Sequence, residues 1–447
     1  MNTNNAKECT TNDKNLNKDK SQIIILHNAR QVITCKGDKP KRAAHLRDIA
    51  MELNSSIVIE KSTIKEIGPS ANIMARYKDQ IKNGTAEFID MTGSVILPGF
   101  VDPHTHALFT GTRENEFQMR IEGKAYVDIL LEGGGILSTV NKVRKSSSDE
   151  LIEATMPRID RMLDYGTTTC EIKSGYGLNT ESEIKMLKAI ATLEKQTPMS
   201  IVPTFMGAHA VPPEFRNRLN DFTDYLVSEM LPAVAEQKLS KYCDIFSEKK
   251  VFPCEPTRKI LEKAVELGFK PKIHADEIDP IGALNIGVEL GAISAEHLIM
   301  TTEEGIDILA KSDTIACLLP GTAFSLMHGK YAPARQMIDK KVAVAIATDC
   351  NPGSCYTESM QAVISIACTQ MGMVPAEAIN AATINAAFAI GMEKEVGSLE
   401  PGKKADIIAM SIPDYKYIPY HFGINHVNFV MKHGEIIKNT SYNVKTN

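Results

Sequence analysis

Five residues of this sequence carry side chains of the kinds that hold catalytic transition metals: His104, His106, His274, His297 and Asp349. His104 and His106 are two residues apart, so in an extended strand both imidazoles point to the same side and can face one ion. Neutral imidazoles and a carboxylate suit zinc, iron, manganese or cobalt. An open coordination position at such an ion would admit a catalytic water.

The positions of these residues strengthen the metal hypothesis, because an isolated pair of histidines is more often incidental. His274 lies in the run KIHADE, His297 follows AISAE, and Asp349 ends VAVAIATD. Each run is a predicted strand, and the three side chains stand at equivalent ends of those strands. We therefore expect all five groups to converge on one site.

The elements that would position these groups alternate between about Val95 and Ala389. Apolar, β-branched runs are separated by amphipathic helices, such as one predicted over residues 148–165 and closed by Gly166. Thr180 and Glu183 predict a capping box at the start of the next helix. Counting from VILPGFVDPHTH gives eight strands. This predicts an α/β fold of the (β/α)8 TIM-barrel type, with its chemistry at the C-terminal ends of the strands.

Both ends of the sequence have a different texture. Residues 1–21 are rich in Asn, Lys, Thr and Asp, and we expect a disordered tail. Short β-branched runs follow to about residue 90, and two more occur near the C-terminus in KADIIAMS and FVMKHGEIIK. We predict a small β-sandwich-like domain built from residues 22–94 and 391–447, beside a barrel that spans residues 95–390.

The composition of the 447 residues narrows the class of protein. A formal net charge of -5 and 23% charged residues give no basic excess for binding nucleic acid. No run approaches the roughly 20 apolar residues that span a bilayer, and the first 22 residues lack the apolar segment of a secretion signal. We expect a cytoplasmic protein without a membrane or nucleic-acid partner. The nine scattered cysteines suggest neither a disulfide framework nor a structural metal site.

Several motifs resemble a known family. PGFVDPHTH resembles the first-strand signature of the amidohydrolase superfamily, and the order of the histidines and the aspartate matches its metal and acid/base residues. TGTREN, EFQMR, LEGGGILSTV, KSGYGL, PTFMGAHAVP, HADE, LLPGT and ATDCNPGS are similar to the imidazolonepropionase family over nearly the whole barrel. The sequence departs from the family at Glu296, where an Asp is expected, and at Ser247, where a Cys is common.

The resemblance implies one Zn²⁺ or Fe³⁺ per chain, with His297 beside the ion as a hydrogen-bonding or proton-transfer group. The implied metal ligands are His104, His106, His274 and Asp349. Some members of the superfamily hold two metals across a carboxylated lysine on the fourth strand, but the fourth strand here, YCDIFSE, contains no lysine. Lys173 lies on the second strand, where it could be a structural cation or a cation on the substrate side.

The reaction that the resemblance implies is hydrolysis of the cyclic amide of 4-imidazolone-5-propanoate to N-formimidoyl-L-glutamate, a step of histidine breakdown. A metal-activated water would attack the carbonyl carbon. Asp349 would accept its proton, and His297 would stabilise the tetrahedral oxygen. Glu277 could share the proton transfer or hold a ring nitrogen; the alternative to both roles is a solvated loop carboxylate. We also expect a homodimer.

The propanoate group of that substrate needs a cation. Arg113 follows the His-x-His strand, and its planar guanidinium can bind a carboxylate through two hydrogen bonds, although a surface arginine is the plainer alternative. Glu277 is a further candidate contact. Other candidates lie at strand ends or in the loops that follow, where they could equally be ordinary loop residues: Tyr176, His209, Asn351, Gly353 and Ser354.

Two other functions are compatible with parts of this pattern. A deaminase of a purine or related heterocycle would keep the metal site and change the substrate, but Arg113 and KSGYGL argue against it. A noncatalytic protein that retains the fold would be expected to lack a metal ligand, and none of the proposed ligands is missing.

Overall fold

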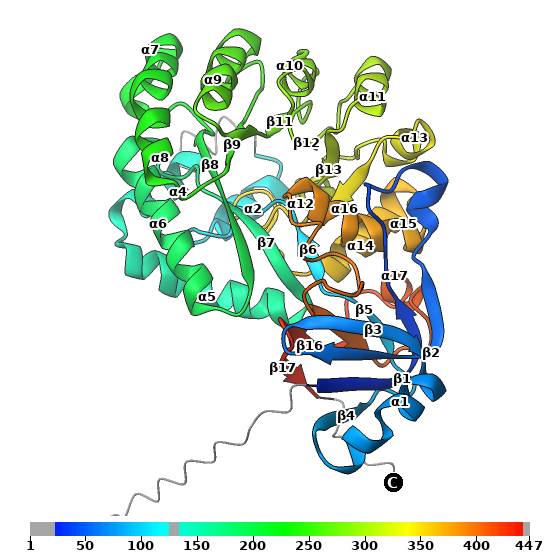
Figure 1. Cartoon of the computed structure of the whole chain (residues 1–447). Helices are drawn as coiled ribbons and strands as arrows, with labels where there is room; N and C mark the ends of the chain where they lie inside the picture. The colour runs from blue at the N-terminus through cyan, green and yellow to red at the C-terminus, as the bar shows by residue number, and fades with distance from the viewer. Residues whose placement is uncertain (1–22, 125–133, 441–447) are drawn as a thin grey trace, which may run out of the picture.

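The computed structural model describes residues 23–124 and 134–440, so the predicted tail of residues 1–21 lies outside the described part. Eight parallel strands form the centre of the molecule (Figure 1). They are β6 (Phe100–Asp102), β7 (Thr167–Lys173), β8 (Ser200–Ala208), β9 (Tyr242–Ile245), β10 (Lys270–Pro271) continued by β11 (Ile273–Ala275), β12 (Ser294–His297), β13 (Ile315–Leu318) and β14 (Val344–Ile346).

Backbone pairing closes these strands into a barrel. One sheet runs β10-β9-β8-β7-β6 and the other runs β11-β12-β13-β14. Since only Lys272 separates β10 from β11, this strand belongs to both sheets. Parallel bridges join Phe246 to His274 and Thr105 to Cys350 at the remaining edges. The predicted (β/α)8 architecture is therefore confirmed, with β6 beside β14 at the closure.

Helices cover the outside of the strands (Figure 1). The helix α5 (Ser148–Asp164) begins with a capping box. The Ser147 hydroxyl accepts from Glu150 N at 3.2 Å, while the Glu150 carboxylate accepts from Ser147 N at 2.8 Å. Gly166, with φ 94°, follows its end. In the described residues, the α-helices between β6 and the end of the barrel are α2 (Glu114–Ile121), α4 (Ile136–Lys145), α5 (Ser148–Asp164), α6 (Thr180–Gln196), α7 (Leu219–Tyr225), α8 (Leu231–Gln237), α9 (Cys254–Glu266), α10 (Ala283–Glu289), α11 (Glu303–Ala310), α12 (Pro320–Ser325), α13 (Ala334–Asp339), α14 (Met360–Met371), α15 (Pro375–Ala381) and α16 (Ile384–Ala389).

Strands from residues 23–98 and 407–439 form one eight-stranded sheet, at the bottom of Figure 1, as the β-rich composition of both regions predicted. Its order is β17-β16-β15-β5-β1-β2-β3, with β4 paired to β1. The strands are β1 (Ile23–Ile33), β2 (Met51–Glu60), β3 (Thr63–Pro69), β4 (Ala86–Asp90), β5 (Val95–Pro98), β15 (Ile407–Met410), β16 (Val427–Lys432) and β17 (Glu435–Asn439). The short helix α17 (Tyr417–Tyr420) lies between β15 and β16.

Two details differ from the sequence-based expectation. The N-terminal segment contains a helix, α1 (Ser70–Lys82), whose buried Ile73 packs with Ile25 and Val58 on one face of the sheet. The run VILP, expected to open the barrel, is β5, which pairs with β1 and β15 in the terminal sheet. The barrel therefore begins after Gly99, and the remaining domain limits stay a prediction. No helix in the described ranges is long and apolar enough to cross a bilayer.

Candidate metal centre and substrate cavity

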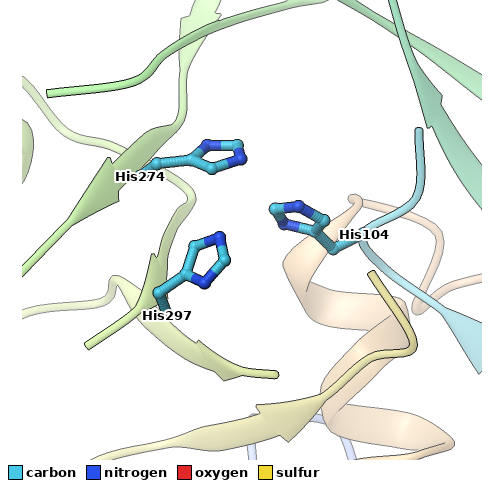
Figure 2. A group of neighbouring side chains, drawn as sticks. All are labelled: His104, His274 and His297. Carbon is cyan, nitrogen blue, oxygen red and sulfur yellow. The ribbon is translucent and has the colours of Figure 1, made fainter. Parts of the chain in front are cut away.

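The five metal-candidate side chains lie together at the C-terminal end of the barrel. His104 and His106 follow β6, His274 lies on β11, His297 ends β12, and Asp349 follows β14. All five are buried, with at most 4% of each residue exposed. Figure 2 shows the rings of His104, His274 and His297 turned toward a common space.

The ligand atoms are close enough to share one ion. Nε2 of His104 and Nε2 of His106 lie 3.4 and 3.8 Å from Oδ1 of Asp349. The ring centroids of His104 and His274 are 4.6 Å apart, and those of His274 and His297 are 5.1 Å apart. In two overlapping groups of three residues, the ligand atoms all lie within 4.8 Å of one another. One group is His104, His106 and Asp349, and the other is His104, His274 and His297.

The hydrogen bonding around these groups fits a cation. Within the described residues, Nε2 of His274 is buried without a hydrogen-bond partner, whereas its Nδ1 lies 3.1 Å from the Asp244 carboxylate. The Thr322 hydroxyl donates to Oδ2 of Asp349 at 2.5 Å, so Oδ1 is the oxygen that faces His104 and His106. Buried polar atoms normally have partners, so the unpaired nitrogen indicates a ligand position.

Electrostatics keep the Asp349 carboxylate charged and His297 neutral. Burial opposes the charge of Asp349, but His104, His297 and the Thr322 hydroxyl outweigh it and hold its pKa at about 2. Burial lowers the pKa of His297 to about 3 despite the nearby Asp349. Burial also opposes protonation of His104, but the Glu296 carboxylate raises its pKa to about 9. Without a cation His104 is therefore an imidazolium beside two carboxylates, and a bound metal would take the place of its Nε2 proton. The resulting set of imidazoles and a carboxylate suits zinc or iron.

Two of the site residues have a strained backbone. His297 has φ 71° and Asp349 has φ 52°, a left-handed conformation that residues other than glycine seldom adopt. At the closure of the barrel, Asp349 N donates to the His104 carbonyl at 3.1 Å and His106 N donates to the Cys350 carbonyl at 3.0 Å. These bonds fix the ends of the first and last strands, and with them three of the proposed ligands.

Five fully buried charged residues lie beneath the histidines, and we call them the buried charge cluster: Glu171, Lys173, Asp244, Lys272 and Glu296. Nζ of Lys173 is 2.6 Å from Glu171, 2.7 Å from Asp244 and 3.0 Å from Glu296. Lys173 does not border the cavity that the described residues enclose, so its structural interpretation is favoured over a substrate-side one. One sequence signal could have indicated part of this cluster: Glu171 and Lys173 are two residues apart along β7, and such residues lie on the same face of a strand.

A cavity of about 580 Å³ opens above the metal-candidate residues. His106, His274, His297 and Asp349 border it. So do all seven residues that the sequence suggested for the substrate, namely Arg113, Tyr176, His209, Glu277, Asn351, Gly353 and Ser354. Arg120, which sequence reasoning missed, also borders it from α2. The cavity therefore brings together every candidate residue except His104, whose Nε2 lies 3.4 Å from Asp349.

The guanidinium of Arg113 is held from one side. Its Nε and Nη2 donate to the two Glu116 oxygens at 2.9 and 2.6 Å. Its Nη1 lies over Gly353, where a Cβ atom would come within 2.2 Å. Gly353 is therefore needed for this close approach, and Glu116 leaves the Nη1 edge of Arg113 available to a ligand.

The Tyr176 loop is held by Glu183, which the sequence assigned to a capping box. The helix α6 is instead capped by Asn179, whose side chain accepts from Ser182 N at 2.8 Å. The buried Glu183 carboxylate accepts from the backbone N–H groups of residues 175, 177 and 178 at 2.7 to 3.2 Å. Nδ1 of His209 donates to the Gly175 carbonyl at 3.0 Å, so His209 depends on the same loop.

Glu277 has an environment that favours its protonated form. Its carboxylate lies 3.5 Å from Nδ1 of His297, and 14% of its side chain is exposed. Burial, followed by the charges of Asp349 and Glu248, raises its pKa to about 8. Glu248 also accepts from the backbone N–H groups of residues 277, 278 and 279 at 2.9 to 3.1 Å, which fixes the loop.

The segment after Asp349 is a compact turn. Oδ1 of Asn351 accepts from Gly353 N and Ser354 N at 2.8 Å, and its Nδ2 donates to the Asp349 carbonyl at 2.7 Å. The Asn351 side chain is thus largely used within the turn. Its position holds Gly353 beneath Arg113 and leaves Ser354 at the border of the cavity.

Sequence comparison places this arrangement in a known family. An imidazolonepropionase from Alkaliphilus oremlandii is 48% identical over 415 residues, which are 93% of this chain and 97% of that protein. The chain belongs to the imidazolonepropionase family. The family member from Geobacillus kaustophilus is 45% identical over 93% of this chain and 98% of its own length. The amidohydrolase family model also matches residues 258–439.

Solved structures show how widely this fold is used outside the imidazolonepropionase family. An adenosine deaminase from Xanthomonas campestris with bound zinc has a TM-score of 0.64 at 16% identity, covering 95% of this chain and 94% of that chain. An atrazine chlorohydrolase from Arthrobacter aurescens complexed with zinc has a TM-score of 0.66 at 14% identity, covering 95% and 97%. At these identities the likeness concerns the fold alone.

Proposed function

We propose that this protein hydrolyses 4-imidazolone-5-propanoate to N-formimidoyl-L-glutamate. The observation that carries the proposal is a single cavity that borders both a buried cluster of imidazoles with Asp349 and the guanidinium of Arg113. The first set suits a metal ion and the second suits a carboxylate. Membership of the imidazolonepropionase family supports the choice of substrate.

We propose one Zn²⁺ or Fe³⁺ per chain, held by His104, His106, His274 and Asp349. When bound, such a cation polarises the carbonyl group of a substrate and lowers the pKa of a water molecule. The proposal of a single ion rests on Lys173. Its ammonium group already supplies positive charge among the carboxylates of the buried charge cluster, so a second cation is not needed there.

The reaction adds one water across the cyclic amide. Its oxygen bonds to the carbonyl carbon, the bond from that carbon to the ring nitrogen breaks, and the nitrogen leaves with a proton. The charged Asp349 can take the proton of the water, since its pKa of about 2 leaves the carboxylate ionised at neutral pH. The neutral His297 can donate a hydrogen bond to the oxygen that gains charge.

Glu277 is suited to supply a proton to the leaving nitrogen. Its pKa of about 8 means that the carboxyl group still carries its proton at pH 7. Asp349 and Glu277 would then divide the proton transfers, with the first accepting and the second donating. Arg113 would bind the propanoate through its Nη1 edge, with Tyr176, His209 and Ser354 bordering the same space.

The test is an assay of the purified chain with synthetic 4-imidazolone-5-propanoate, with the product identified by mass spectrometry. Elemental analysis of the same sample should give about one equivalent of zinc or iron, and removal of the metal should abolish turnover. Adenosine serves as the control substrate and should not react. Full activity in metal-free protein, or two equivalents of metal, would contradict the proposed mononuclear mechanism. Analytical ultracentrifugation tests the expected homodimer.

A further inference from the structure

The buried charge cluster is unusual for the inside of a barrel. Inner layers of such barrels are normally filled by apolar branched side chains contributed by alternate strands. Here Lys173, Asp244 and Glu296 come from the second, fourth and sixth barrel strands, β7, β9 and β12, and none is exposed. Charged side chains therefore occupy positions where apolar side chains would be expected.

The contacts of the cluster lead directly to two proposed metal ligands. Asp244 places Oδ2 at 2.7 Å from Nζ of Lys173 and Oδ1 at 3.1 Å from Nδ1 of His274. Glu296 places Oε2 at 3.0 Å from the same Nζ and also in contact with Nδ1 of His104. One carboxylate therefore connects the Lys173 ammonium group to each imidazole: Asp244 to that of His274, and Glu296 to that of His104.

The remaining two members hold the cluster from below. Nζ of Lys272 lies 2.7 Å from Oε1 of Glu171 and 3.2 Å from Oε1 of Glu296. The hydroxyls of Thr204 and Ser294 donate to the same two oxygens at 2.5 and 2.7 Å. Three carboxylates and two ammonium groups leave one negative charge in excess, directly beneath the imidazoles.

Stability alone does not account for such a cluster. Removing charges from water is costly, and a buried ion cluster can often be replaced by apolar residues without loss of stability. A carboxylate on the second nitrogen of a ligating histidine, by contrast, fixes the orientation of the ring and strengthens its metal binding.

We infer that Lys173 is a positioning residue for the metal centre. Its ammonium group holds Asp244 and Glu296 against Nδ1 of His274 and His104, so that Nε2 of both rings is presented to the metal. Lys173 does so from a position that does not border the cavity, and it is not one of the proposed metal ligands. The inference rests on the proposed metal-dependent function and concerns how its ligands are oriented.

The experiment measures metal affinity in Lys173→Met. The purified variant is stripped, reloaded with Zn²⁺ or Co²⁺ and titrated against a competing chelator. Its affinity should fall by about tenfold to a hundredfold. The visible spectrum of the Co²⁺ form should change, because the orientation of His104 and His274 changes.

Lys432→Met is the matched control. Lys432 is also a buried lysine, 1% exposed. It pairs with Asp406 and donates a hydrogen bond to the Ser200 hydroxyl at 2.8 Å, near the N-terminal ends of the strands. Losing it should cost folding stability while the metal affinity and the Co²⁺ spectrum remain those of the wild type. A decrease of equal size in both variants would overturn the inference, because the loss would then reflect general destabilisation.

Asp244→Asn provides the second variant should Lys173→Met not fold. It keeps the side-chain volume and removes the charge between Lys173 and His274, so metal affinity should again fall. Wild-type affinity and spectrum in whichever of these two variants is folded would overturn the inference. Full activity of the wild-type protein without bound metal would instead contradict the proposed metal-dependent mechanism.

Discussion

The inner wall of the site and its rim are held in place by different means. The inner wall consists of His104, His106, His274, His297 and Asp349, which lie on barrel strands or immediately after them. Backbone hydrogen bonds between the segments that follow β6 and β14 hold these groups, together with the buried charge cluster. Changing one inner-wall residue therefore disturbs strands that also carry other ligands.

The rim consists of Arg113, Tyr176, Glu277 and the turn 351–354, which lie on loops. A single carboxylate holds each of the first three: Glu116 binds the Arg113 side chain, while Glu183 and Glu248 bind loop backbone. The comparison suggests that substrate contacts can vary through loops while the metal centre stays unchanged, as is usual in barrels of this kind.

The largest effect is expected in the inner wall, from Asp349→Asn. The change removes the charge that faces His104 and His106, and with it the proposed proton acceptor. Turnover should fall by roughly a thousandfold or more, while the fold is retained. Steady-state kinetics on samples of known metal content measure this. Near-native turnover in a correctly metallated sample would show that another group, with Glu277 first in line, accepts the proton.

Glu277→Gln tests the group that joins the inner wall to the rim, and turnover should fall by about a hundredfold. Because the protonated form is the proposed donor, wild-type activity should decrease as the pH rises through about 8, the pKa of Glu277. The variant should lose this decrease. A pH profile of kcat/KM measures it, with Asp279→Asn on the exposed part of the same loop as the control.

Glu277→Gln should raise the stability of the metal-free protein at high pH, although it lowers turnover. The folded pKa of Glu277 lies above its ordinary value of 4.5, so ionising the group costs stability progressively between about pH 4.5 and pH 8. The metal-free Glu277→Gln variant should therefore have a higher Tm than the metal-free wild type at pH 8. The two should agree near pH 4, and a lower Tm at pH 8 would show that Glu277 supports the fold.

A rim substitution, Arg113→Met, should weaken substrate binding and leave metal content unchanged. A charge-assisted contact to a carboxylate contributes roughly 1.5 to 3 kcal/mol, so kcat/KM should fall by about tenfold to a hundredfold. The control substrate is an imidazolone with an uncharged amide in place of the propanoate, on which the variant should lose little further. Equal losses on both substrates would mean that Arg113 serves mainly as the partner of Glu116.

The smallest effect is expected from Glu183, which does not border the cavity. Glu183→Gln removes the charge that binds three backbone N–H groups of the Tyr176 loop, at a cost of about 1 to 3 kcal/mol in stability. The KM should rise by about threefold to tenfold with little change in kcat. Glu181→Gln, an exposed change on the same helix, is the control. An unchanged KM would separate the loop from substrate binding.

The sequence by itself was sufficient to predict the architecture and the side of a strand on which a residue lies. Alternation of strands and helices predicted the barrel, and the spacing of His104 and His106 predicted that both rings face one way. A strand repeats every two residues, so local spacing determines which face a side chain occupies. For the same reason the ends of the strands could be recognised as the place where polar groups collect.

Only the tertiary structure decided which groups meet. Glu183 was expected to cap its own helix, but the preceding loop turns back onto it, and backbone N–H groups there bind a full charge. The sequence left open whether Lys173 faces the substrate. In the closed barrel, Asp244 and Glu296 from other strands surround its ammonium group. Contacts between distant strands depend on their order and on barrel closure. Neither is encoded in the spacing of neighbouring residues.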